Sequence, residues 1–169
     1  ALYERQQSGR GQHVDISMLD CQISMLNYMA TMHFLSGRDP EPIGNSHFVH
    51  VPYNSYSTSD GHIIIAVIFD SFWENLLKVV DFEPFRQEKY KTQPGRLEDK
   101  AFIDGKLNDI LSTNTSEYWL RALQEQRIPC ARVNHFSEAL SDQQVLSRNM
   151  VVELRHPDGK STRGPGNPI

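Results

Sequence analysis

The chain has 169 residues, of which 38% are hydrophobic and 22% are charged, with a formal net charge of −4 and a sequence pI near 6.0. This composition excludes disordered and collagen-like proteins and supplies enough apolar mass for a compact core. Nucleic acids and anionic membranes call for clustered Lys and Arg, and no apolar run approaches the ~20 residues of a membrane span, so we expect neither partner.

The amino-terminal part predicts a helix, a strand and a second helix. Residues 1–7 have a helical pattern that closes on Gly9. Residues 12–19 alternate apolar and polar side chains, which predicts a short strand. Apolar residues then recur at helical spacing over 19–35, which predicts one long helix ending at Gly37. The chain opens without a methionine inside a helical pattern, so we expect a piece of a longer protein.

A segment rich in proline and glycine, residues 37–45, cannot continue this helix and predicts a domain boundary. A hairpin follows it. Residues 53–58 alternate with period two, Asp60 and Gly61 predict the turn, and residues 63–69 are apolar on both faces, as in a central strand.

The rest of the chain predicts helices, a return strand and a second hairpin. Helical spacing occurs four times, over 71–81, 84–90, 95–112 and 115–126, the last with Thr115 as N-cap. Residues 128–133 predict the return strand, two short helices follow, and Asp158-Gly159 predicts the turn of the second hairpin. This order indicates an α+β fold with a small antiparallel sheet and several helices.

Taken singly, the motifs define no active site. His47 and His50 form an H-x-x-H pair without an acidic or cysteine partner nearby, so we expect no metal site. There is no G-x-S-x-G nucleophile elbow and no G-x-G-x-x-G dinucleotide loop. The two cysteines, Cys21 and Cys130, suggest no disulfide framework, and we expect a cytoplasmic protein.

Taken together and in order, the motifs are informative. The segments SGRGQHVDISMLD, P-x-G-N-S-H, VPYNSYSTSDGHIIIAV, RIPCARVN and GPGNPI follow one another along the chain. This series resembles the family III CoA-transferases, the superfamily of formyl-CoA transferase, carnitine CoA-transferase and α-methylacyl-CoA racemase. The resemblance covers essentially the whole chain.

The resemblance implies a domain organisation and an assembly. It divides the chain into the end of a large domain's first half with its exit helix (1–36), a linker and active-site loop (37–52), the small domain (53–157) and the start of a return linker (158–169). The strand and long helix expected before the small domain would belong to the large domain. The resemblance further implies a homodimer of interlocked subunits.

The resemblance also implies the chemistry. An aspartate attacks the acyl-CoA thioester, an aspartyl-CoA thioester forms, and a carboxylic acid acceptor then takes the CoA. That aspartate is expected upstream of this chain, so we assign no catalytic residue here and expect the segment alone to be inactive. The partners are an acyl-CoA and a carboxylic acid; coenzyme A is a substrate, and no cofactor is expected.

The resemblance places Gly44, Asn45, Ser46 and His47 in the loop that faces the active-site cleft. A glycine, an amide, a hydroxyl and an imidazole there are suited to bind a substrate carboxylate. The alternative, a purely structural entry into the hairpin, stays open.

Two further alternatives remain for the function. Racemase members carry a small-domain glutamate near the end of the first hairpin, and this chain has Asp70 there, which is equally suited to be a helix N-cap. We favour the transferase over the racemase. The other alternative is a non-catalytic interaction module that self-associates through the apolar side of the 19–35 helix.

Overall fold

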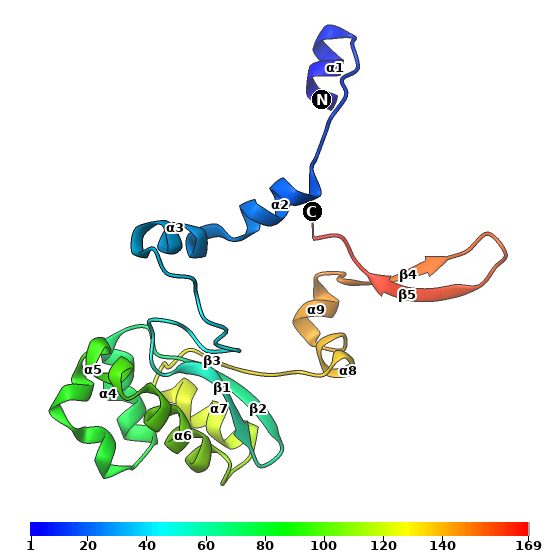
Figure 1. Ribbon diagram of the computed structural model, residues 1–169. Coiled ribbons are helices and arrows are strands. Elements are labelled where there is room, and N and C mark those ends of the chain that lie inside the picture. The colour runs from blue at the N-terminus through cyan, green and yellow to red at the C-terminus, as the bar shows by residue number, and fades with distance from the viewer. Residues whose placement is uncertain (169) are drawn as a thin grey trace. The chain divides into compact units, whose positions relative to one another are not determined.

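In the computed structural model, which describes residues 1–168, the chain divides into two units, Ala1–Pro42 and Ile43–Ile169 (Figure 1). Ile169, the last residue of the expected return linker, lies outside the described residues. The mixed α+β fold class is confirmed. The four-part domain assignment stays a prediction.

The first unit holds three helices, α1 (Leu2–Ser8), α2 (Met18–Met25) and α3 (Asn27–Ser36). Gly9 and Gly37 end α1 and α3 in the left-handed conformation, with φ of 70° and 67°, as expected for glycine C-caps. The described side chains of this unit are all exposed or half-exposed, so the unit has no buried core of its own.

Two expectations for this unit are wrong. The strand over 12–19 does not form, because Ser17 acts as an N-cap whose Oγ accepts from the Asp20 N–H (3.2 Å) and α2 starts at Met18. The alternation also has no partner strand within the first unit. The single helix over 19–35 is two helices, since Asn27 adopts φ 49° at the junction, a conformation that asparagine tolerates better than most residues.

The second unit is built on a three-stranded antiparallel sheet with the order β1-β2-β3. Its strands are β1 (Tyr53–Thr58), β2 (Gly61–Ala66) and β3 (Cys130–Arg132). The hairpin, the central position of its second strand and the return strand are therefore confirmed. The turn lies one residue earlier than expected, since Thr58 pairs with Gly61, and β2 stops at Ala66, short of residue 69.

Only one face of β2 enters the core. Ile63 and Ile65 are fully buried, whereas Ile64 between them is 39% exposed. The apolar residues on both faces of this segment correctly predicted a central strand. Within the described part of this unit, however, helices cover only one of the two faces.

Helices and 3-10 turns between β2 and β3 cover that face. They are α4 (Asp70–Val79), η1 (Glu83–Arg86), η2 (Glu88–Lys91), α5 (Gln93–Glu98), α6 (Lys100–Leu111) and α7 (Ser116–Glu125). The expected helix over 84–90 is thus two 3-10 turns, and that over 95–112 is α5 followed by α6. The Thr115 cap is confirmed, because its Oγ1 accepts from the Tyr118 N–H (3.3 Å).

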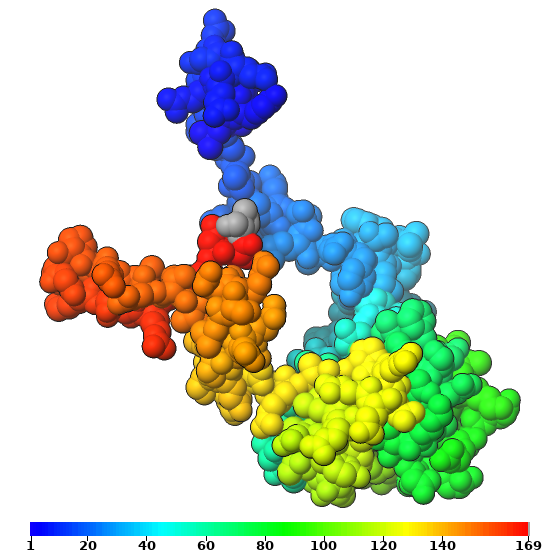
Figure 2. All heavy atoms as spheres, turned by 180° about the vertical axis from the view of Figure 1, so that it is seen from behind, coloured from blue at the N-terminus to red at the C-terminus, as the bar shows by residue number. Residues whose placement is uncertain are grey.

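Helix α6 packs on β1, and α7 packs on β2 and β3. In Figure 2 the green-to-yellow part of the chain, which carries α4 to β3, forms one closely packed body. Its core is mainly apolar, and the indole of Trp119 in it is satisfied because Nε1 donates to the Leu111 carbonyl (2.7 Å). The buried apolar residues are Val51, Tyr56, Ile63, Ile65, Val67, Trp73, Leu76, Val80, Phe85, Tyr90, Ile103, Leu107, Leu111, Trp119, Leu123 and Ile128.

The carboxy-terminal elements are two short helices and a second hairpin. They are α8 (Phe136–Ala139), α9 (Gln143–Ser147), β4 (Val151–Arg155) and β5 (Ser161–Pro165). Gly159 takes φ 88° in the turn between β4 and β5, which confirms the expected hairpin.

Candidate functional site

The loop that leads into β1 begins with an exposed glycine. Gly44 has φ 61°, a left-handed conformation that glycine adopts without strain. A side chain at this position would meet no atom within 4 Å. Gly44 and Asn45 are exposed, so the start of the loop is accessible to a ligand.

Asn45 and Ser46 use part of their hydrogen-bonding capacity to shape the loop. Asn45 Nδ2 donates to Ser55 Oγ of β1 (3.0 Å), and Ser46 Oγ donates to the Ile43 carbonyl (2.8 Å). Both side chains retain acceptor oxygens. Among residues 1–168, no hydrogen bond engages the backbone N–H of Gly44 or of Asn45.

A backbone hydrogen bond and two ring contacts fix the orientation of His47. Its N–H donates to the Tyr53 carbonyl (3.0 Å), which closes the loop onto the first residue of β1. The imidazole stacks on Phe48 and on Tyr53, with centroid separations of 4.5 and 5.1 Å and interplanar angles of 21° and 18°.

The imidazole of His47 also closes the loop on itself. The backbone N–H groups of Val49 and His50 both donate to His47 Nδ1, at 3.0 and 3.1 Å. Two donors directed at one ring nitrogen require that nitrogen to be unprotonated, so the proton of the neutral ring lies on Nε2. Nε2 has no hydrogen-bond partner among the described residues and remains a donor for a ligand.

The surroundings keep this imidazole neutral. Burial, and then the neighbouring His50 and Lys100, hold the pKa of His47 below its ordinary value of 6.5. Lys100 is itself paired with Asp104 (2.6 Å). His47 therefore offers a neutral N–H, and not an imidazolium charge, at physiological pH.

His50 lies beside His47 in the same loop. Its ring is half-buried, lies 4.6 Å from that of His47, and has an Nδ1 without a hydrogen-bond partner in the described part of the chain. The H-x-x-H pair thus brings the two rings together, but one nitrogen of His47 is already used by the backbone.

Two residues of α5 hold the same loop from outside it, and the sequence patterns did not single them out. Gln93 Nε2 donates to the Val49 carbonyl (2.9 Å), and Arg96 Nε donates to the Val51 carbonyl (2.8 Å). Arg96 is fully buried. A buried arginine 45 residues further along the chain has no local sequence signal, because charged side chains are ordinarily exposed.

Asp70 neither caps α4 nor stands as a free acid. It is the first residue of α4, Phe69 takes the N-cap position, and no side chain caps this helix end. The Asp70 carboxylate instead pairs with Arg96 Nη2 at 2.7 Å. The N-cap interpretation is therefore wrong.

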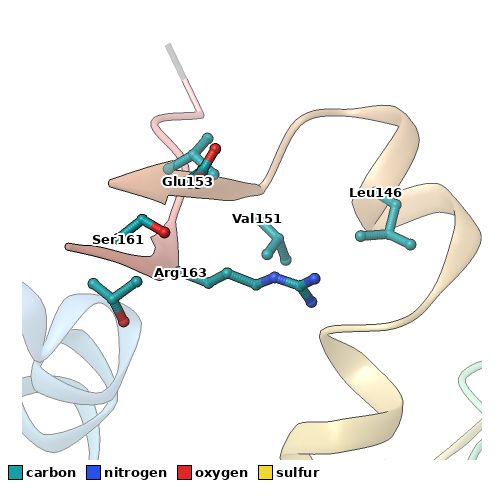
Figure 3. Close-up of a pocket in the computed structure, with 7 residues that line it drawn as sticks. Leu146, Val151, Glu153, Ser161 and Arg163 are labelled. Atoms are coloured by element: carbon teal, nitrogen blue, oxygen red, sulfur yellow. The ribbon is translucent and has the colours of Figure 1, made fainter. Parts of the chain in front are cut away.

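A groove of about 780 Å³ lies elsewhere in the second unit, between α9 and the second hairpin (Figure 3). Leu146, Val151 and Arg163 border it, with Glu153 and Ser161 on the same hairpin. The Glu153 carboxylate pairs with Arg155 (3.2 Å) and is exposed. This groove lacks convergent buried polar groups, so we place the candidate site at the loop.

The described residues contain neither a cluster of metal ligands nor a helix that could span a membrane. No cluster of three or more His, Cys, Asp or Glu side chains in residues 1–168 is arranged to hold a metal ion. Within the same residues, every helix is too short or too polar to cross a bilayer.

The family model for CoA-transferase family III matches residues 1–169 of this chain. The succinate–glutarate CoA-transferase of Agrobacterium fabrum is 31% identical over 174 aligned positions, covering 100% of this chain and 42% of that protein. The succinyl-CoA:mesaconate CoA-transferase of Haloarcula hispanica is 29% identical, covering 93% of this chain and 39% of that protein.

Among solved structures, a CAIB/BAIF family protein from Brucella suis superposes with a TM-score of 0.77 at 25% identity, covering 99% of this chain and 48% of that one. The chain therefore spans about two fifths of the length of these curated relatives.

Proposed function

Because this chain belongs to CoA-transferase family III, we propose that the full-length protein transfers CoA from an acyl-CoA to a carboxylic acid. The match of the family model over the whole chain supports this proposal, as do the relatives named above, which are called CoA-transferases. Coenzyme A enters as a substrate, and the proposal needs no other cofactor.

We propose the covalent route for this transfer. A carboxylate of the enzyme, an aspartate that precedes Ala1, attacks the thioester carbonyl and expels the CoA thiolate, which leaves a mixed anhydride. The thiolate then attacks the aspartyl carbonyl, forming the enzyme-bound thioester and releasing the first acid. The acceptor carboxylate reverses these two steps and leaves as its CoA ester, so one difficult exchange becomes several reversible ones. No residue of this chain takes a covalent part.

The loop of Gly44, Asn45, Ser46 and His47 is proposed to bind a carboxylate of the acid substrate. The observation that carries this role is the double hydrogen bond to His47 Nδ1, which puts the ring proton on Nε2 and leaves it without a partner in residues 1–168. The backbone N–H groups of Gly44 and Asn45 are further donors without a partner in residues 1–168. Neutral donors bind a carboxylate through charge-assisted hydrogen bonds.

The acid is proposed to be a dicarboxylic acid. Succinate, glutarate and mesaconate, which appear in the names of the relatives, all carry a second carboxylate that takes no part in the transfer. A loop that binds this second group would fix the orientation of the first. Succinyl-CoA with glutarate or mesaconate is therefore the first substrate pair to assay with the full-length protein.

A His47→Asn variant of the full-length protein tests the role of the loop. Asparagine keeps an acceptor oxygen for the N–H groups of Val49 and His50 and removes the Nε2–H donor. Loss of one hydrogen bond to a carboxylate predicts a rise in the acceptor KM of about 10- to 100-fold in steady-state kinetics.

His135→Asn is the matched control, because His135 precedes α8 and asparagine is a good residue at a helix N-cap. This control should leave the acceptor KM unchanged. An unchanged acceptor KM in His47→Asn would return the loop to a purely structural role.

We also propose that the protein forms a homodimer and is located in the cytoplasm. The two free cysteines, Cys21 and Cys130, suit a reducing compartment. The exposed apolar side chains of the first unit suit an assembly in which other protein covers them.

A further inference from the structure

Both backbone polar groups of Val49, its N–H and its carbonyl, are hydrogen-bonded. Its N–H donates to His47 Nδ1, and its carbonyl accepts from Gln93 Nε2 at 2.9 Å. Two residues later, the Val51 carbonyl accepts from Arg96 Nε at 2.8 Å. The same stretch of backbone that fixes the imidazole of His47 is thus fixed in turn by α5.

Arg96 is itself immobilised. Besides Val51, its guanidinium donates to the Tyr90 carbonyl (2.7 Å) and to the Gln93 side-chain oxygen, and it pairs with Asp70 (2.7 Å). It also lies over the ring of Trp73, 5.3 Å from the centroid. Moving this buried guanidinium would break these hydrogen bonds and leave the Val51 and Tyr90 carbonyls without this donor, which is costly for buried groups.

Close backbone packing sets the position of α5. A Cβ at Gly95 would lie 1.9 Å from the Lys89 carbonyl oxygen, so only glycine lets α5 approach η2 this closely. Gln93 and Arg96 lie on either side of Gly95 in the sequence. The close packing of α5 on η2 thus places their side chains within hydrogen-bonding distance of the Val49 and Val51 carbonyls.

We propose that Gln93 and Arg96 are positioning residues for the substrate loop. They hold the backbone at Val49 and Val51, which in turn sets the direction of the His47 Nε2–H toward the substrate carboxylate. This inference rests on the proposed function of the loop. Neither residue touches the substrate in this scheme; both act through His47.

Gln93→Ala in the full-length protein tests this proposal, because Gln93 is only half-buried and its removal leaves Arg96 paired with Asp70. Loss of one hydrogen bond to the loop predicts a rise in the acceptor KM of about fivefold, with kcat changed less than about twofold. Amide hydrogen exchange at Val49 and His50 should accelerate by a similar factor.

Gln87→Ala is the matched control. Its side-chain amide also donates to a backbone carbonyl, that of Pro84 (3.0 Å), but in η1 and not in the loop. This variant should leave both the acceptor KM and the exchange at Val49 and His50 unchanged.

A double-mutant cycle with His47→Asn separates positioning from general stability. If Gln93 acts through His47, Gln93→Ala should raise the acceptor KM no further in the His47→Asn background. An equal rise in both backgrounds would overturn the proposal, as would unchanged exchange at Val49 in Gln93→Ala.

The His47→Asn variant alone reports on the function of the loop. If it raises the acceptor KM and Gln93→Ala does not, the positioning role fails and the substrate loop stands. If His47→Asn has no effect, the substrate loop itself fails, and the positioning role fails with it.

Discussion

One nitrogen of His47 is committed to the loop backbone, and the other carries the proton. Protonation of Nδ1 would replace an acceptor of two hydrogen bonds by a donor that faces two donors. Burial, His50 and Lys100 oppose the same protonation, which is why the pKa of His47 is lowered. The histidine thus stabilises the loop only in its neutral form.

This predicts how the stability of the chain depends on pH. Because the folded state holds the pKa of His47 below 6.5, the unfolded state binds the proton more readily, and the contribution of His47 is complete above pH 6.5 and lost as the pH falls. Denaturant unfolding of the native chain and of His47→Asn, compared between pH 8 and pH 5, measures this. The difference in unfolding free energy between the two should shrink on acidification; a difference that widens would show that protonation favours the loop.

The residues of the loop, Gly44 to His47, could be selected from the sequence. The residues of α5 that hydrogen-bond to the loop backbone could not. Gly44 to His47 stand in a recognisable order of motifs, so their place was predicted, while their role as substrate ligands stays a prediction. Gln93 and Arg96 lie 44 and 45 residues from the carbonyls that they bind. Such contacts arise only when the helices pack, and no local pattern reports them.

Among the helices and strands, a prediction was correct where the sequence pattern also had a neighbouring element in the fold to pair or pack with. The hairpin of β1 and β2 has alternating side chains, a turn and a third strand to pair with, and it forms, with its turn one residue earlier and β2 shorter than expected. The alternating residues 12–19 have no partner strand in their unit, so no strand forms, and Ser17 instead caps helix α2. The helical pattern over 95–112 forms two helices, α5 and α6, and the break lies at Asp99, which takes a non-helical conformation (φ −107°, ψ 27°).

Two helical glycines provide a matched test of that packing. Gly95→Ala places a methyl group against the Lys89 carbonyl and should destabilise the chain by about 3 kcal/mol. Gly105→Ala lies on the exposed side of α6 with nothing within 4 Å and should stabilise it by about 0.5–1 kcal/mol. Tryptophan fluorescence during denaturant unfolding reports both, since Trp73 and Trp119 lie in the core.

Equal effects of the two alanine substitutions would contradict the close approach of α5 to η2. If Gly95→Ala lowers the unfolding free energy by less than predicted, the turn at Lys89 moves aside easily.

In the chain as a whole, the first unit leaves many large apolar side chains exposed, and such exposed apolar groups often mark an interaction surface. Met18, Leu19, Phe34 and Leu35 are 84%, 69%, 82% and 84% exposed. The family's curated relatives are more than twice as long as this chain, so much of their sequence is available to cover such a surface.

The 169-residue chain by itself is therefore expected to self-associate. Sedimentation velocity should show concentration-dependent oligomers, and Leu19→Lys with Phe34→Lys should reduce them. Phe136→Lys, which changes an 87% exposed aromatic residue in the second unit, is the control and should have little effect. A strict monomer at high concentration would show that this apolar surface needs no partner.

Membership of CoA-transferase family III is the reason to propose covalent catalysis for the full-length protein. The racemase alternative would proceed by proton transfer and would exchange the α-hydrogen of a branched acyl-CoA with deuterated water, without acylating the enzyme. In this chain Asp70, the acid suggested for that role, is paired with Arg96.

The most direct measurement is to incubate the full-length protein with succinyl-CoA, add hydroxylamine or borohydride, and locate the modified residue by peptide mass spectrometry. The proposed mechanism predicts one aspartate, in the sequence preceding Ala1, converted to its hydroxamate or alcohol only when acyl-CoA is present. Exchange of the α-hydrogen with solvent and no modified aspartate would contradict the assignment as a transferase.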